Sequence, residues 1–257
     1  MPCDALRQKF QTMVGLKRCT ELLAISIKHC KHFSLHMLRG QCSEMLTKND
    51  KAEEEYLKAR RLVPNTVDPI EALANLKYKL KKYKEAKKLY TKLQSKDSDK
   101  ALYLLRLLKL LRREQLNRKA YRLLRRNINK FEKDFPLQVE AVYVYATNRR
   151  RYWKARKLLK QLKEDYTSSK QVIQLHYAQA NLYSRLGKTK KAIQEYSAIL
   201  EKDDKQVEAY YLRGKMFLKR RKYRQCYNDT SKLLKLVPNH PDEDAIKLWR
   251  DTCRRKM

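Results

Sequence analysis

Apolar residues recur along this chain at the three- and four-residue spacing of an amphipathic helix. The stretch 175–200 shows the pattern clearly, because a first apolar series ends at Gly187 and a second series begins after it. A glycine between two such series interrupts a helix. We therefore predict two amphipathic helices joined by a turn, whose inward faces are made of Leu175, Ala178, Leu182 and Leu186, and of Ala192, Ile193, Tyr196 and Leu200.

This helix–turn–helix pattern returns with a nearly constant period. Met37–Gly40 and Tyr211–Gly214 both end in Leu-Arg-Gly, and a proline follows each glycine by 24 residues, at Pro64 and Pro238. Between these landmarks a small side chain recurs at intervals of 34, 34, 35, 37 and 34 residues. These small anchors are Ala52, Ala86, Ala120, Ala155, Ala192 and Cys226. A period of this length indicates stacked structural repeats.

Small residues on the first helix of a repeat allow the second helix to cross it closely. Gly40, Ala74, Ala180 and Gly214 are suited to that crossing, whereas the third and fourth repeats have Leu108 and Tyr143 at the same place. We expect the crossing to differ in those two repeats. Tyrosines fill the wider gaps between helix pairs, at Tyr56, Tyr90 and Tyr196.

These residues resemble the tetratricopeptide repeat family, whose period is 34 residues. The first repeat has the family's small, aromatic, alanine and proline residues at Gly40, Ala52, Tyr56, Ala59 and Pro64; the second at Ala74, Tyr83, Ala86 and Tyr90; and the last at Gly214, Tyr223, Cys226 and Pro238. The resemblance implies an all-α, right-handed α-solenoid of about six repeats over residues 33–240. It also implies a general ligand-binding scaffold. Residues 1–32 are expected to form a helical region that is a degenerate repeat, and residues 241–257 a capping helix with a basic tail.

Composition supports a folded helical protein. The 257 residues include 42% hydrophobic residues, which is too many for a disordered basic tail, and only 4 Gly and 6 Pro, which are too few for a fold rich in tight turns. No apolar run is long enough to span a membrane, and residues 1–23 lack the apolar segment of a secretory signal. We therefore expect an intracellular protein with no membrane partner.

Six cysteines are spread along the chain without a CxxC pair, and we expect reduced thiols in a reducing compartment. The basic clusters 219–222 and 254–256 resemble nuclear import signals, which favours the nucleus or cytoplasm. The basic residues near the start suit a mitochondrial presequence less well, because Asp4 and Glu21 interrupt them.

Charge is the feature that the fold does not explain. Lys and Arg number 62 against 28 Asp and Glu, a formal net charge of +34. Equivalent positions of stacked repeats lie on the same edge, and the cations gather at the turn between the two helices of each repeat. We predict a cationic rim that binds nucleic acid through Lys79, Lys81, Lys82, Arg112, Arg113, Arg149, Arg150, Arg151, Lys219, Arg220, Arg221 and Lys222. Lys188, Lys190 and Lys191 occupy the same turn of the fifth repeat, while many of the acids stand in the opposite turns.

A solvated surface would explain a modest excess of cations. A net charge of +34 makes the cations repel one another, which favours a polyanionic partner. We expect RNA or a ribonucleoprotein, with a protein segment in the groove. The alternative is a protein adaptor that binds acidic peptides or tails in the concave groove implied by the resemblance. That groove would be lined by Asn75, Tyr78, Tyr177, Asn181, Tyr211 and Lys215.

Catalytic chemistry is not indicated. Gly187–Thr189 resembles the end of a phosphate-binding loop, but the required earlier glycine is Leu182. His32, His36 and Cys42 form a local His/Cys cluster with His29 and Cys30, yet no second pair with metal-ligand spacing accompanies it. No Ser/His/Asp or Cys/His set can be proposed. We therefore predict no enzyme activity, no catalytic residue, no metal and no cofactor.

Overall fold

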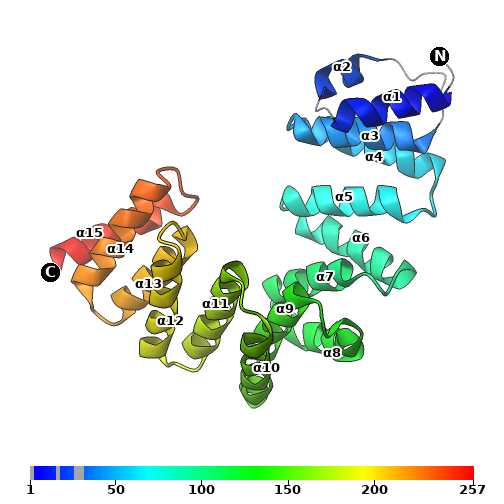
Figure 1. Ribbon diagram of the computed structural model, residues 1–257. Helices are drawn as coiled ribbons and strands as arrows, with labels where there is room; N and C mark the ends of the chain where they lie inside the picture. The colour runs from blue at the N-terminus through cyan, green and yellow to red at the C-terminus, as the bar shows by residue number, and fades with distance from the viewer. Residues whose placement is uncertain (1–2, 16–17, 26–31) are drawn as a thin grey trace. The chain divides into compact units, whose positions relative to one another are not determined.

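The structure is a computed structural model that describes residues 3–15, 18–25 and 32–257. The chain divides into two compact units, residues Met1–Glu114 (unit 1) and Gln115–Met257 (unit 2), which are described separately. Throughout the described residues the regular structure is helical, without strands, so the predicted all-α class is confirmed (Figure 1).

Unit 1 consists of seven α-helices within the described ranges. They are α1 (Cys3–Gly15), α2 (Cys19–Ala24), α3 (Phe33–Met45), α4 (Asn49–Leu62), α5 (Val67–Lys79), α6 (Tyr83–Lys96) and α7 (Ala101–Arg113). Unit 2 contains α8 (Asn117–Asn127), α9 (Phe135–Tyr145), α10 (Tyr152–Asp165), α11 (Ser169–Arg185), α12 (Thr189–Lys202), α13 (Val207–Lys219), α14 (Tyr223–Leu236) and α15 (Glu243–Arg255), with short 3-10 helices at Ile128–Phe131 and Arg149–Arg151.

The predicted anchors hold each helix pair together. All six of them, Ala52 to Cys226, are completely buried. The helices pack in the order of the chain, with α3 against α4, α5 against α6, α11 against α12 and α13 against α14. A buried small residue lets these helix axes approach closely. The period of the sequence therefore corresponds to a real period in packing.

The turns inside the repeats share one backbone conformation. A residue with φ between 57° and 71° occurs at Thr47, Lys81, Gln115, Gly187 and Arg221. These positions are separated by 34, 34, 72 and 34 residues, so only the fourth repeat lacks one. There the Asn148 side chain accepts a hydrogen bond from the backbone N–H of Arg150, and the 3-10 helix follows. The left-handed residue reverses the chain between the two helices of a repeat, and Gly187 alone adopts it without the usual steric cost.

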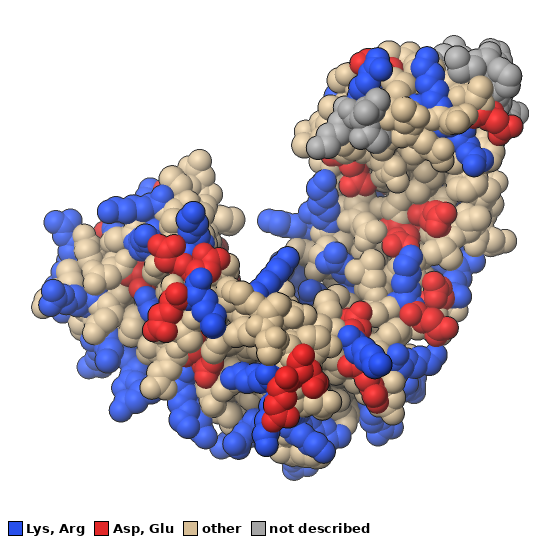
Figure 2. All heavy atoms as spheres, viewed as in Figure 1, with Lys and Arg blue, Asp and Glu red and all other residues tan. Residues whose placement is uncertain are grey.

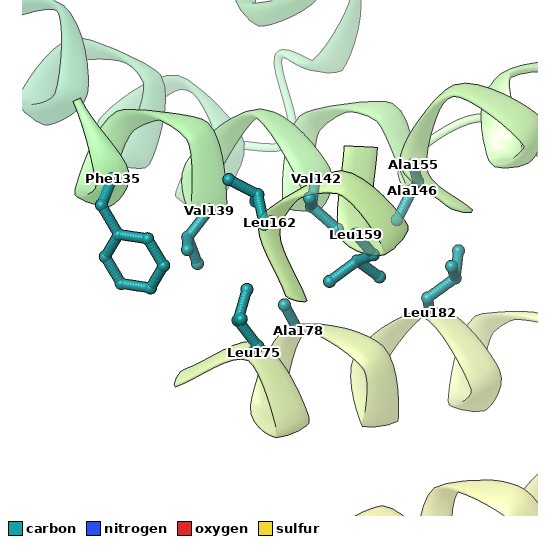
Figure 3. Packing of buried hydrophobic residues seen from close by; sticks show 10 residues of the cluster. All are labelled: Phe135, Val139, Val142, Ala146, Ala155, Leu159, Leu162, Leu175, Ala178 and Leu182. Atoms are coloured by element: carbon teal, nitrogen blue, oxygen red, sulfur yellow. The ribbon is translucent and has the colours of Figure 1, made fainter. Parts of the chain in front are cut away.

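The core of unit 2 shows how consecutive repeats stack. Val139 and Val142 from α9 and Leu159 from α10 point toward Leu175 and Leu182 on α11 (Figure 3). Each fully buried Leu or Val side chain contributes roughly 1.5–3 kcal/mol relative to its exposed state. The α9–α10 pair therefore buries its apolar face against the next repeat, as solenoid repeats do.

The two glycines at the helix crossings have different neighbours. A Cβ atom on Gly40 would lie 2.3–2.9 Å from three ring atoms of Tyr56, which is only 2% exposed. On Gly214 it would lie 3.4 Å from the Cβ of Asp229 and 3.6 Å from the Cγ2 of Thr230, which is ordinary contact. Only the first crossing therefore requires glycine.

The large residue predicted to alter the third crossing is itself part of the core. Leu108 is fully buried, and the boundary between the two units falls in the same repeat, after Glu114. Tyr143, its counterpart in the fourth repeat, is half-buried against the cluster that joins α9, α10 and α11. None of the described helices combines the length and apolar character needed to cross a membrane.

The prediction of reduced thiols is wrong for four cysteines. Cys19 is disulfide-bonded to Cys42, and Cys226 to Cys253. The Cα atoms lie 4.9 Å and 6.2 Å apart, because the bonds join packed neighbours, α2 with α3 and α14 with α15. Spacing along the chain could not reveal this juxtaposition. Cys3 and Cys30 fall outside the described side chains, and the intracellular location stays a prediction.

Replacing Gly40 by Ala should destabilise the protein by about 1–3 kcal/mol, because the buried Tyr56 ring must move. Gly214→Ala is the matched control, and it should be neutral or stabilising, since Ala is the better helix former and its Cβ would make only ordinary contacts. Urea unfolding of both variants measures the difference. Equal losses of stability would contradict the assignment.

Removal of the Cys226–Cys253 bond should lower the free energy of unfolding by about 2–4 kcal/mol. The double variant Cys226→Ala/Cys253→Ala makes the test, because alanine is the family's own residue at position 226. Urea unfolding gives the loss, and peptide mapping of the unreduced wild type detects the linked peptides. A variant as stable as the oxidised wild type would argue against a bond that fastens α15.

Candidate functional site

The turn surface of unit 1 is partly neutralised. Lys79 Nζ lies 3.7 Å from a carboxylate oxygen of Glu44, and Lys82 Nζ lies 3.9 Å from one of Glu53. The neighbouring Lys77 is buried and bonds both Glu53 and Glu85, at 2.5 and 2.7 Å. Carboxylates, most of which were expected in the opposite turns, therefore also stand here, on the helices next to the cations.

The other predicted cations of unit 1 lie close to this turn. Lys81 is exposed in the left-handed conformation, and Arg112 is half-buried. The exposed Arg113 places its guanidinium carbon 4.2 Å from the centre of the Tyr83 ring. This contact joins the turn of the third repeat to that of the second, so the two turns lie side by side within unit 1.

The turn surface of unit 2 has a different character. We use this name for Arg149–Arg151, Lys188, Lys190, Lys191 and Lys219–Lys222. Among the ion pairs that the structure records between described residues, none includes a member of this surface. Figure 2 shows Lys and Arg along much of the lower edge of unit 2, with Asp and Glu in one group higher up and in another close to that edge. The predicted cationic turns are therefore present here without neutralising carboxylates.

Two of these turns meet around one cavity. Lys188, Lys190 and Lys191 from the fifth repeat and Arg220 from the sixth line a space of about 340 Å³, together with Gly187 and Thr189. This lining, all of it within the described chain, has four cationic residues and no carboxylate. Like charges so close repel one another, and an anionic ligand would relieve that repulsion. This cavity is the strongest candidate site on the turns.

The fourth repeat continues the turn surface of unit 2. The Tyr152 hydroxyl donates a hydrogen bond to the backbone carbonyl of Arg185, 3.3 Å away, which ties the fourth turn to the fifth. Arg149 and Arg150 are exposed. Arg151 is half-buried, with its guanidinium carbon 3.4 Å from the centre of the Tyr121 ring. Arg149 and Arg150 are therefore the members of this turn that present free charge.

The predicted groove residues of unit 1 make contacts inside the protein. Asn75 accepts a hydrogen bond from the Tyr90 hydroxyl at 2.6 Å. The Tyr78 ring lies under the guanidinium of Arg106 at 4.4 Å and meets the rings of Tyr83 and Tyr90 edge to face. These contacts give both residues a structural role in the packing of α5 against α6 and α7.

The predicted groove residues on α11 are similarly engaged. The Tyr177 hydroxyl donates to Gln206 at 3.4 Å, and its ring meets Tyr196 edge to face. Burial raises the pKa of Tyr177 to about 12. Asn181 accepts a hydrogen bond from the side chain of Arg185 at 3.3 Å. Both side chains are half-buried, so neither is a free contact group.

The last predicted groove residues pack against the C-terminal helix. The Tyr211 ring stacks on His240 at 5.7 Å and lies 5.3 Å from Trp249 of α15, measured between ring centres. Lys215 is exposed, with its ammonium 6.0 Å from the Trp249 ring. Lys215 is thus the one predicted groove residue that is both exposed and charged.

Two features escaped the sequence analysis. Arg213 and Asp229 form a two-pronged pair, 2.8 Å at each contact, and Arg213 also donates to Ser197. Trp153 on α10 is 62% exposed although it is large and apolar. A signal for Trp153 existed, because it lies off the buried stripe of Ala155, Leu159 and Leu162, amid basic residues. The Arg213–Asp229 pair had no signal, because it depends on how two helices meet.

The histidines and cysteines serve structural roles where they are described. His36 bonds Glu55 through Nδ1 at 2.7 Å, His32 caps α3, and Cys42 is in a disulfide. His29 and Cys30 lie outside the described residues. Among the residues that are described, no three side chains are grouped to hold a metal ion.

Comparison with known proteins gives a family match within unit 2 and a shared fold. Residues 177–224 match the family model described as Tetratricopeptide repeat. A tetratricopeptide repeat protein from Parabacteroides merdae shares the fold, with a TM-score of 0.79, 16% identity and 98% of each chain covered. No curated protein matches the chain.

Two further structures have the same fold at lower similarity. The hetero-tetramer Cut9–Hcn1 of the APC/C gives a TM-score of 0.66 at 15% identity, covering 97% of this chain and 49% of the other. Pseudomonas aeruginosa pilF gives 0.54 at 15% identity, covering 84% and 96%. The predicted resemblance is confirmed: residues 177–224 match the tetratricopeptide repeat family, and the chain has the helical repeat fold of tetratricopeptide repeat proteins.

Buried tyrosines between repeats should make the fold sensitive to alkali. Burial raises the pKa values of Tyr90, Tyr103, Tyr177 and Tyr196 to about 12, against 10.0 for a free side chain. Between these values only the unfolded chain loses the protons, so stability falls as pH rises from about 10 to 12. The fall is about 1.4 kcal/mol per pH unit for each tyrosine.

Urea unfolding across this pH range measures the slope, and Tyr196→Phe should reduce it by one tyrosine's share. The absorbance of tyrosinate gives an independent reading on the folded protein. Titration of all tyrosines together near pH 10 would contradict the assignment.

Proposed function

We propose that this tetratricopeptide repeat protein is a non-catalytic adaptor that binds an acidic segment of a partner protein. The observation that supports it is the turn surface of unit 2, where Lys188, Lys190, Lys191 and Arg220 surround one cavity without a carboxylate. Arg offers two parallel hydrogen bonds to a carboxylate, and Lys offers a compact charge. An extended acidic chain could follow the turns from one repeat to the next.

A protein partner accounts for the features better than RNA does. Single-stranded RNA is bound largely by stacking of bases on aromatic rings. The tyrosines of the predicted groove, Tyr78, Tyr177 and Tyr211, have packing partners inside the protein. Cut9–Hcn1, which has a similar fold, is a complex between proteins. That example supports an adaptor role for this chain as well.

Charge reversal in the cavity tests the proposal. Lys188→Glu/Lys190→Glu/Lys191→Glu should weaken binding of a fluorescent oligo-glutamate peptide by about tenfold or more, because three attractions become repulsions. The control Lys51→Glu/Lys88→Glu/Lys92→Glu changes the net charge equally on exposed residues of unit 1. It should weaken binding much less, because none of these three lysines lines the cavity.

The competing ligand is part of the same experiment. A single-stranded RNA with the same number of negative charges is titrated beside the peptide at 0.15 M salt. Tighter binding of RNA would favour the nucleic-acid role that the net charge alone suggests. Equal losses in the two triple variants would show that only net charge matters and would overturn the proposed site.

A further inference from the structure

Trp153 is unusual for its surroundings. It is 62% exposed on α10, whose other exposed residues are all polar or charged, and it lies off the buried stripe that holds α10 in the core. A single exposed apolar residue is ordinary in a soluble protein. A binding role for Trp153 therefore depends on the residues that surround it.

A second cavity of unit 2 adjoins this ring. It has a volume of about 440 Å³ and is lined by residues of α9, of α10 and of the 3-10 helix that follows α8. Its apolar lining comes from Ile128, Tyr145, Trp153, Leu158 and Leu162. Burial raises the pKa of the Tyr145 hydroxyl, in keeping with an apolar environment. The volume is within the range of sites that hold small ligands, so a large apolar side chain fits.

The charged residues that line this cavity are separated by sign. Lys154 and Lys157 line it at the start of α10, while Asp165 lines it at the end, with Glu132 on the other side. Lys157 and Asp165 are eight residues apart, which is about 12 Å along a helix. The positive end continues into Arg149 and Arg150, the exposed part of the turn surface of unit 2. An acidic chain on that surface would thus reach Trp153 from the positive end.

We propose that the acidic segment carries a large apolar side chain beside its carboxylates, and that this side chain docks against Trp153 in the cavity on α10. This inference rests on the proposed function and names the partner more closely, as an acidic segment with an apolar anchor. A second copy of this chain is disfavoured as occupant, because each copy has a net charge of +34 and repels the other.

Fluorescence can follow the docking directly. The chain has two tryptophans, so Trp249→Phe leaves Trp153 as the only reporter. Two peptides are titrated: oligo-glutamate with one central Leu, and the same peptide with Ser in place of Leu. The Leu peptide should bind about tenfold or more tightly, and it should shift the Trp153 emission to the blue and protect the ring from acrylamide. The Ser peptide should do neither.

Substitution separates the two contacts. Trp153→Ala should abolish the advantage of the Leu peptide and leave the Ser peptide unaffected. Leu248→Ala is the matched control, since Leu248 is 61% exposed on α15 and lines none of the cavities described here. It should change neither affinity. The variant Lys188→Glu/Lys190→Glu/Lys191→Glu should weaken the binding of both peptides by the same factor.

The outcomes distinguish the two proposals. Equal affinities for the two peptides, with Trp153 still open to acrylamide, would overturn the apolar anchor and leave the acidic adaptor standing. Failure of both peptides to bind would overturn the adaptor and the anchor together. A concentration-dependent dimer that Trp153→Ala abolishes, detected by sedimentation, would assign the cavity to a second copy and overturn this inference.

Discussion

Close approach of two helices over a small side chain is the contact on which each repeat depends. The six anchors have no exposed surface, and at Gly40 even a methyl group would collide with Tyr56. Once two helices cross at such a point, their remaining apolar residues form a face that neither helix can bury alone. Stacking against the next repeat buries it, as the α9–α10 pair does against α11.

Stacking also brings like charges of successive turns close together, so that they repel one another. Equivalent turns lie side by side, so cations that are distant in sequence become neighbours. Unit 1 relieves the repulsion with carboxylates, since Glu44 and Glu53 stand among the lysines. The turn surface of unit 2 has no such relief among its described residues, and Arg220 faces the lysines of the preceding turn. A repeat architecture thus turns a difference in local sequence into a difference between whole surfaces.

Each disulfide fastens a pair of helices that pack against each other. Cys226 occupies an anchor position, and its bond to Cys253 fastens α15 to α14. Cys19 and Cys42 similarly join α2 to α3. A covalent link of this kind opposes separation of the two helices that it joins.

Periodicity along the chain was enough to predict the class of fold, the anchors and the turn at Gly187. Each of these depends on which face of a helix is apolar, and a helix has the same geometry wherever it occurs. The resemblance of 33–240 to tetratricopeptide repeats followed from that pattern alone.

Only the tertiary structure decided the pairings between side chains of different helices. It joined Cys226 to Cys253, placed Arg213 on Asp229, put Glu44 and Glu53 among the unit 1 cations, and engaged the tyrosines that the sequence assigned to a groove. Such contacts depend on the distance and rotation between two helices and on the rotamers at their interface. The spacing of residues along the sequence does not determine those quantities.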